Sequence, residues 1–176
     1  MKLNFLSLSI ILLASIAANA KVPTNQTNIN NEQAKIAKAI KISGKWARPA
    51  FKGKNTAAFM VIKNTSDKDI YLTKATCCSK ALAKKVELHN HVMEGSIARM
   101  RPVGPQGIKV PANGEVKLKR GGLHIMLIGL SKDVRLNRDL NLNLQFKNTP
   151  TEAGGTWLKQ VAFPVHSRNP AKEVNK

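Results

Sequence analysis

Three features of the sequence predict an all-β protein built as an antiparallel β-sandwich. Short apolar or alternating runs recur between residues 43 and 163, and clusters of turn-forming residues separate them. Residues 140–147 alternate Leu or Phe with Asn, Gln or Lys, which is typical of a strand with one buried and one solvated face. Residues 57–62, AAFMVI, are apolar on both faces and therefore predict a central strand. Eight or nine strands within about 120 residues favour a sandwich.

The expected strands follow one another closely. Turn residues separate them at 64–67, 94–96, 111–114 and 121–122, where Gly, Asn, Asp, Ser and Pro concentrate. In chain order, strands are expected at residues 44–48, 56–64, 69–76, 85–92, 97–103, 115–119, 123–130, 140–148 and 156–165. No internal repeat and no phosphate-loop, Rossmann or nucleophile-elbow motif interrupts this series. The sequence therefore predicts a single domain.

The N-terminus is expected to be a cleaved secretory signal peptide covering residues 1–20. Lys2 precedes an apolar run over residues 6–16, and residues 18–20, Ala-Asn-Ala, have the small-x-small pattern of a cleavage site. The run is short for a membrane-spanning helix, and no cysteine follows it that could carry a lipid. We therefore expect export to the periplasm.

The segments that flank the β-domain carry weaker patterns. Residues 21–42 begin as an Asn-rich polar stretch, and from residue 31 onward they fit either a short basic helix or a disordered segment. Residues 164–176 have no periodic pattern and are expected to be a flexible tail. The β-domain is therefore assigned to residues 43–163.

The charge is strongly positive, because 29 Lys and Arg residues oppose only 10 Asp and Glu residues, for a net charge of +19. Such an excess is typical of proteins that bind nucleic acid. Against that function, the chain has one Tyr and five Phe, none of them interleaved with basic clusters, and it is expected to leave the cytoplasm. We expect no nucleic-acid partner, and an acidic protein or an anionic membrane surface instead.

The only two cysteines, Cys77 and Cys78, are neighbours in the sequence. Adjacent cysteines rarely reach disulfide geometry without distorting the backbone. Two thiols, a strained bridge between them, an intermolecular bridge and an accessory pair of copper ligands all remain open. No function is assigned to them.

The candidate site is a set of neutral, soft metal ligands. Histidines and methionines concentrate between residues 86 and 126, where imidazole and thioether groups occur without a carboxylate pair or an activated nucleophile. Thioethers select Cu(I), whereas imidazole alone would also suit Zn, Ni or Cu(II). In the run 123–127, LHIML, strand alternation places His124 and Met126 on one face, roughly 7 Å apart. The composition of this stretch therefore favours Cu(I).

The same alternation orients the neighbouring strands. In 85–91, KVELHNH, it directs Val86 and Leu88 inward and Glu87, His89 and His91 outward. Met100 lies between two arginines that point away from its face. Three strands could therefore present one ligand set to a single point, namely His89, Met100, His124 and Met126.

These residues resemble those of a known family. Residues 46–50 (WARPA), 57–64 (AAFMVIKN), 85–94 (KVELHNHVME), 99–103 (RMRPV) and 120–130 (RGGLHIMLIGL) are similar to the periplasmic copper chaperones called PCuAC. That family is marked by a His, ten residues, a Met, a gap of a little over twenty residues and then His-x-Met. Here ten residues separate His89 from Met100, and twenty-three separate Met100 from His124.

The resemblance implies a cupredoxin-like Greek-key sandwich and a Cu(I) site made by His89, Met100, His124 and Met126. It also implies a function, the delivery of copper to the dinuclear centre of cytochrome c oxidase subunit II, together with a Sco-type copper protein. A site without thiolate differs from electron-transfer copper centres, which use a cysteine ligand. Carriage of copper by a monomer is therefore expected, and catalysis is not.

Two rival classes remain. A small copper oxidase or reductase would need an open coordination position and a substrate pocket, and no acid–base pair accompanies the ligands. A metal-free basic sandwich that binds an acidic partner or an anionic membrane would not depend on these side chains. Of the other candidates, His91 could be a spare or an entry ligand, Met93 is expected to be structural, and Met60 belongs to the core. His166 lies in the tail and is expected to take no part in this site.

Overall fold

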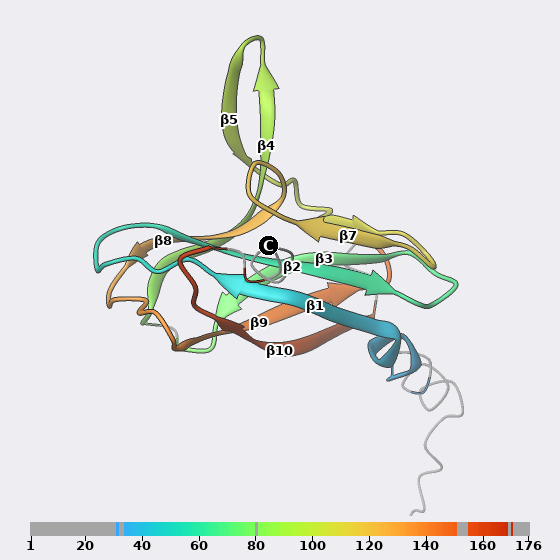
Figure 1. Ribbon diagram of the computed structural model, residues 1–176. Helices are drawn as coiled ribbons and strands as arrows, with labels where there is room; N and C mark the ends of the chain where they lie inside the picture. The colour runs from blue at the N-terminus through green and yellow to red at the C-terminus, as the bar shows by residue number, and fades with distance from the viewer. Residues whose placement is uncertain (1–30, 32–33, 80, 151–154, 169, 171–176) are drawn as a thin grey trace, which may run out of the picture.

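The computed structural model describes residues 31, 34–79, 81–150, 155–168 and 170, and it is built almost entirely of antiparallel strands. Two sheets face each other, as Figure 1 shows. The strands are β1 (Ile40–Ala47), β2 (Thr56–Asn64), β3 (Ile70–Cys77), β4 (Ala83–Glu94), β5 (Ile97–Pro102), β6 (Ile108–Val110), β7 (Glu115–Leu118), β8 (His124–Leu130), β9 (Asp139–Lys147) and β10 (Thr156–Pro164). The expected all-β, cupredoxin-like Greek-key sandwich is confirmed.

The larger sheet contains six strands in the order β1-β2-β8-β4-β5, with β7 also paired to β2. β8 and β7 follow one another along the same edge of β2: Thr56–Ala58 pair with β8, and Met60–Lys63 pair with β7. The turn between β7 and β8 therefore faces the middle of β2. The smaller sheet has the order β10-β9-β3-β6.

The core fills the space between the two sheets. β9 shows the expected alternation, since Leu140, Leu142, Leu144 and Phe146 are all buried. Met60 is also buried in this core, as expected. Burial of such side chains is the main favourable contribution to folding.

Strand β2 is central and buries both of its faces. Ala58, Met60 and Ile62 point into the main core. On the other face, Ala57 and Phe59 form a second apolar cluster with Trp46, and Met126 packs against it. The rings of Trp46 and Phe59 lie 4.6 Å apart between centroids. The outer surface of the six-stranded sheet is therefore partly apolar, and this surface carries the candidate site.

Nine of the ten strands coincide with expected ones, and β6 is the strand that the sequence did not predict. It spans only three residues, which is too short for an alternating pattern to be recognised. Ile108 and Val110 are nevertheless buried, because β6 pairs with β3 at the edge of the smaller sheet.

The folded domain extends beyond residues 43–163 at both ends. Residues 34–39 are helical and β1 begins at Ile40, and both Ile36 and Ile40 are buried against the core. At the other end β10 continues to Pro164, and Val165 is buried and bridges to Ala47. Burial of these apolar side chains orders the flanking segments. Two or three apolar residues form too short a pattern to predict this order from the sequence.

The expected signal peptide, residues 1–20, lies outside the described residues, as do residues 21–30. Among the helices that the structure does describe, none has the length and apolar character needed to cross a membrane.

Candidate metal centre

The register of β4 against its two neighbours gathers the donor residues on one face. Three cross-strand pairs lie in a row: Glu87 opposite Met126, His89 opposite His124, and His91 opposite Met100. Directly opposed residues in an antiparallel pair point to the same side of the sheet. Three strands thus contribute donors to one face, as the alternation predicted.

The far half of β4 leaves the sandwich. Beyond His89 it pairs only with β5, and Figure 1 shows this hairpin standing clear of both sheets. Its two-residue turn begins at Gly95, whose φ of 63° is readily adopted by glycine. All residues of β5 are exposed, including Met100 at 50%. Met100 is therefore carried by a projecting arm.

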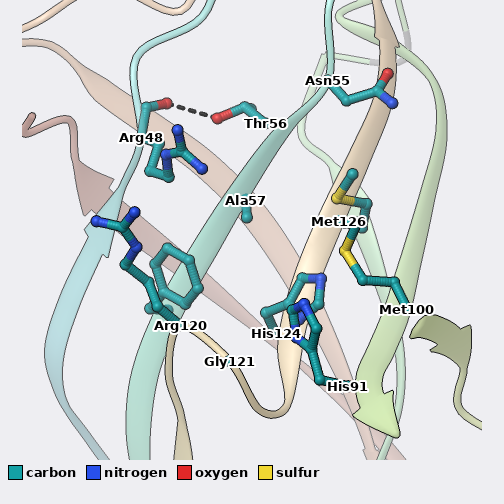
Figure 2. Close-up of a pocket in the computed structure, with 11 residues that line it drawn as sticks. Arg48, Asn55, Thr56, Ala57, His91, Met100, Arg120, Gly121, His124 and Met126 are labelled. Carbon is teal, nitrogen blue, oxygen red and sulfur yellow. Dashed lines mark hydrogen bonds between the residues drawn. The ribbon is translucent and has the colours of Figure 1, made fainter. Parts of the chain in front are cut away.

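A cleft of about 330 Å³ lies where this arm meets the sheet. Figure 2 shows the thioether groups of Met100 and Met126 pointing toward each other above the imidazoles of His91 and His124. The rings of His91 and His124 are 5.3 Å apart between centroids. Two sulfur and two nitrogen donors therefore line one cleft.

His89 does not line the cleft and is buried, with 8% exposure. Its ring centroid is 5.7 Å from that of His124. Its Nε2 lies 3.0 Å from Oε2 of Glu87, and because a carboxylate only accepts hydrogen bonds, Nε2 must be the donor. In the neutral ring Nδ1 then carries the lone pair, and this buried atom has no hydrogen-bond partner. An unpartnered buried nitrogen is costly unless it has another ligand, such as a metal.

His124 is also held in one tautomer. Its Nδ1 lies 2.9 Å from the carbonyl oxygen of Gly122, so Nδ1 donates and Nε2 keeps the lone pair. Gly122 belongs to the β7–β8 turn, in which Gly121 adopts a φ of 74°. Burial lowers the pKa of His124 below the ordinary imidazole value, despite the opposing effect of the Gly122 hydrogen bond. The neutral form, which is the one able to bind metal, is therefore favoured.

Glu87 is the supporting residue that the sequence did not single out. The hydrogen bond from His89 and then that from Lys85 hold the pKa of its carboxyl below the ordinary value. Carboxylates that accept a hydrogen bond from a metal-binding histidine fix its tautomer and raise its basicity. The outward alternation in residues 85–91 was the signal that could have identified it.

All four expected ligands lie on one face, although they are not equally placed. Met100, His124 and Met126 line the cleft, while His91 rather than His89 is the second histidine in its wall. His91, expected to be a spare or an entry ligand, thus lies in the wall of the cleft. Met93 was expected to be structural, but it is 66% exposed near the hairpin turn and packs in no core.

The cysteines lie elsewhere. Both are free thiols in the smaller sheet region, and Cys77 is buried while Cys78 is exposed. Cys78 Sγ lies 3.4 Å from Nε2 of Gln160 and 3.3 Å from Oδ1 of Asn143. Burial raises the pKa of the Cys77 thiol, which disfavours the thiolate that metals bind. Neither cysteine lines the cleft.

Within the described part of the chain, no three His, Cys, Asp or Glu side chains are grouped so that they could hold a metal ion. A metal in this cleft would therefore depend on the thioether sulfurs of Met100 and Met126. Thioethers discriminate against Mg²⁺, Ca²⁺ and Mn²⁺, which prefer oxygen ligands, and favour Cu(I).

The fold and the cleft define a class, a cupredoxin-like sandwich with soft donors on the outer face of its larger sheet. Residues 40–157 match the protein family described as "Putative lipoprotein LpqE-like". A relative from Leifsonia xyli subsp. xyli (strain CTCB07), described as "Putative lipoprotein Lxx21020", is 30% identical over 139 residues, covering 79% of this chain and 76% of the relative. This chain belongs to the LpqE-like family.

Two solved structures share the fold. The copper-bound PCuAC domain from PmoF2 is 21% identical with a TM-score of 0.51, and the match covers 73% of this chain and 94% of that domain. The apo PCuAC domain from PmoF1 is 18% identical with a TM-score of 0.52, covering 73% and 95% respectively. The expected resemblance to PCuAC proteins is confirmed at the level of the fold.

Proposed function

We propose that this protein is an exported copper-binding protein that carries Cu(I) and passes it to another protein. One observation carries the proposal: two thioethers and two imidazoles line a single cleft, and no thiolate or carboxylate accompanies them. The PCuAC domain of PmoF2, which has the same fold, is described as copper-bound. The proposed ligands are the four expected residues, His89, Met100, His124 and Met126. His89 does not line the cleft, but its buried Nδ1 has no hydrogen-bond partner. His91, which does line the cleft, is a fifth candidate.

The donor set suits carriage. Four neutral ligands leave the bound ion with only its own single charge, and no thiolate is present to hold it against a stronger acceptor. Met100, which lines the cleft, is half exposed, so an acceptor could reach a bound ion from that side. No carboxylate or thiol lines the cleft beside its two imidazoles, so the lining offers soft metal donors and no carboxylate–imidazole pair, which supports a carrier rather than an enzyme.

The proposed location and partners of the protein rest on its resemblance to PCuAC proteins. It supports a periplasmic location and delivery of the copper to subunit II of cytochrome c oxidase, with a Sco-type copper protein as a second partner. The lipoprotein descriptions of the family and of the Leifsonia relative are consistent with a protein that leaves the cytoplasm. A monomer is sufficient for this function, because one chain contains the whole donor set.

The test is copper loading under anaerobic, reducing conditions. One Cu(I) per chain is expected, with X-ray absorption showing both sulfur and nitrogen neighbours. The double variant Met100→Leu/Met126→Leu should lose the sulfur contribution and bind copper much more weakly. As a matched control, Met93→Leu on the same hairpin should bind copper normally.

Two results would contradict the proposal. Copper bound without sulfur neighbours would remove the thioethers from the site. A chain that holds no copper, yet keeps its partner after His89 and Met100 are both replaced, would be the metal-free basic interaction module instead.

A further inference from the structure

The proposed copper cleft contains an electrostatic conflict. Two of its lining residues are arginines, Arg48 and Arg120, and none of its lining residues is acidic. Figure 2 shows both guanidinium groups together on one side of the cleft, across from Met100 and Met126. A cleft that is suited to a cation is thus positively charged even when it holds no metal.

The backbone positions of both arginines are fixed by the same elements that build the cleft. The Arg48 amide donates to the carbonyl of Ala57, and Thr56 Oγ1 donates to the carbonyl of Arg48 at 2.7 Å. Arg120 lies in the β7–β8 turn, which Lys119 closes on both sides through backbone hydrogen bonds with Gly122 and Leu123. This is the turn whose carbonyl orients His124, so the backbones of both arginines are held beside the proposed ligands.

Several carboxylates elsewhere on the protein form ion pairs with other basic residues. Arg99 and Arg101 both pair with Glu94, and Arg135 pairs with Asp133. Glu87, the acid on the face that carries the donors, contacts Lys85 and His89. Within the described residues, the side chains of Arg48 and Arg120 form no ion pair.

Copper loading increases this positive charge. Neutral ligands add no negative charge, so a bound Cu(I) ion adds one positive charge beside the two guanidinium groups. A cationic partner would be repelled, whereas a carboxylate could accept two parallel hydrogen bonds from the guanidinium fork. Because both arginines are exposed, the main effect falls on the rate of encounter and on its salt dependence, not on affinity.

We propose that Arg48 and Arg120 form the docking surface for a copper-exchange partner that presents carboxylates around its own copper-binding groups. This inference rests on the proposed function, because the arginines border the proposed copper ligands. Beyond the proposed function, it specifies that the partner is negatively charged and that it approaches from the side of the cleft where the two arginines lie. Copper loading would strengthen the attraction, so that the loaded form is the one recognised best.

The first experiment measures how fast chelators of different charge remove Cu(I) from the loaded full-length protein. Disulfonated bathocuproine is the anionic acceptor and neocuproine the neutral one. Arg48→Gln/Arg120→Gln should slow removal by the anionic chelator about threefold to tenfold at low salt. The difference should vanish near 1 M salt, where the Debye length is about 3 Å. Removal by neocuproine should not change.

Lys74→Gln/Lys84→Gln is the matched control. It removes two exposed positive charges, one from β3 and one from β4, which line a separate hollow and not the cleft. This control should leave both rates within about twofold of the unsubstituted protein, since distant exposed charges are largely screened. Equal slowing in the control, or equal slowing with neocuproine, would overturn the docking surface and leave only a general charge effect.

A second experiment needs no copper. The apo protein is titrated with hexaglutamate peptide while backbone amide shifts are followed by NMR. The amides of Ala57 and Gly121 should shift first, and the shifts should weaken in Arg48→Gln/Arg120→Gln but not in the control. Shifts confined to other surfaces would overturn the inference whatever the copper result. A protein that binds the peptide here yet holds no Cu(I) would instead refute the proposed function alone.

Discussion

The two halves of strand β4 carry similar donors in opposite environments. Residues 83–89 pair with β8 inside the sheet, where His89 is 8% exposed and bonded to Glu87. Residues 90–94 pair only with the exposed β5, on the hairpin that projects in Figure 1. One half therefore holds its imidazole in place, whereas the other half can move its donors with little loss of buried contacts.

The difference indicates how a carrier could bind a metal and still release it. Local opening costs least where few apolar contacts and many exposed backbone hydrogen bonds are involved. The hairpin fits that description and carries Met100 and His91, while His124 and His89 belong to the closed sheet. We expect the sheet imidazoles to determine whether copper binds, and the hairpin donors to determine how quickly it leaves.

The largest expected effect comes from removing a sheet imidazole. His124→Ala should weaken Cu(I) binding by more than about 100-fold, exceeding the 10–100-fold typical when an outer-shell partner of a metal ligand is lost. His91→Ala, the matched change on the hairpin, should cost less than about tenfold. Competition against a Cu(I) chelator measures both, with circular dichroism to establish that each variant is folded. Equal losses would mean that the sheet and the hairpin contribute alike to copper binding.

The next effect concerns the carboxylate that orients His89. Glu87→Leu should weaken Cu(I) binding by about tenfold or more, because His89 would lose the acceptor that fixes its tautomer. Glu87→Gln should lose less, since the amide oxygen still accepts from Nε2. Nitrogen NMR shifts of the His89 ring should report a mixture of tautomers in the Leu variant only. Glu115→Leu, which removes an acid from β7, is the control and should change neither reading.

Replacing each thioether separates binding from packing. Met126 packs against the Trp46 cluster, so Met126→Leu should cost less than about 1.5 kcal/mol of apo stability. Met100→Leu should leave apo stability unchanged, because Met100 is half exposed. Both variants should bind Cu(I) more weakly, and the Met100 variant should also release it faster.

Mild peroxide should oxidise Met100 before Met126, because Met100 is more exposed. Peptide mass spectrometry measures the order, and a reversed order would contradict the exposed position of Met100.

The smallest effect is the pH dependence of apo stability. Burial lowers the pKa of His124 in the folded state below its value in the unfolded chain, so the unfolded chain takes up the proton first as the pH falls. This contribution is fully present above about pH 6.5 and decreases below it. The urea midpoint should therefore fall between pH 7.5 and 5.5, and less steeply in His124→Ala. If the urea midpoint fell equally steeply with pH in both proteins, a group other than His124 would cause the pH dependence.

Strand positions and side-chain faces could be predicted from the sequence because strand alternation is a local property. Consecutive side chains in an extended chain must point to opposite sides, whatever the partner strand is. The pairing of His124 with Met126 on one face and Ile125 with Leu127 on the other follows from this rule alone. The soft character of the donors also follows directly from residue types.

Burial and proximity could not be predicted in this way, because they depend on which strands become neighbours. The alternation placed His89 outward, yet His89 is buried, because it pairs with Pro102 of β5 and His124 of β8 and its ring lies against that of His124. His91 lines the cleft and His89 does not, because β4 pairs only with β5 beyond His89.

The position of the positive charge relative to the donors could not be predicted from the sequence either. Arg48 and Arg120 are 72 positions apart in the sequence, and the pairing of β2 with β1 on one side and with β7 and β8 on the other brings them to one cleft. Composition alone determined that this protein is strongly basic and carries a soft, neutral donor set. Tertiary structure decided where the charge meets the donors, because strand pairing joins distant segments through contacts that no local pattern encodes.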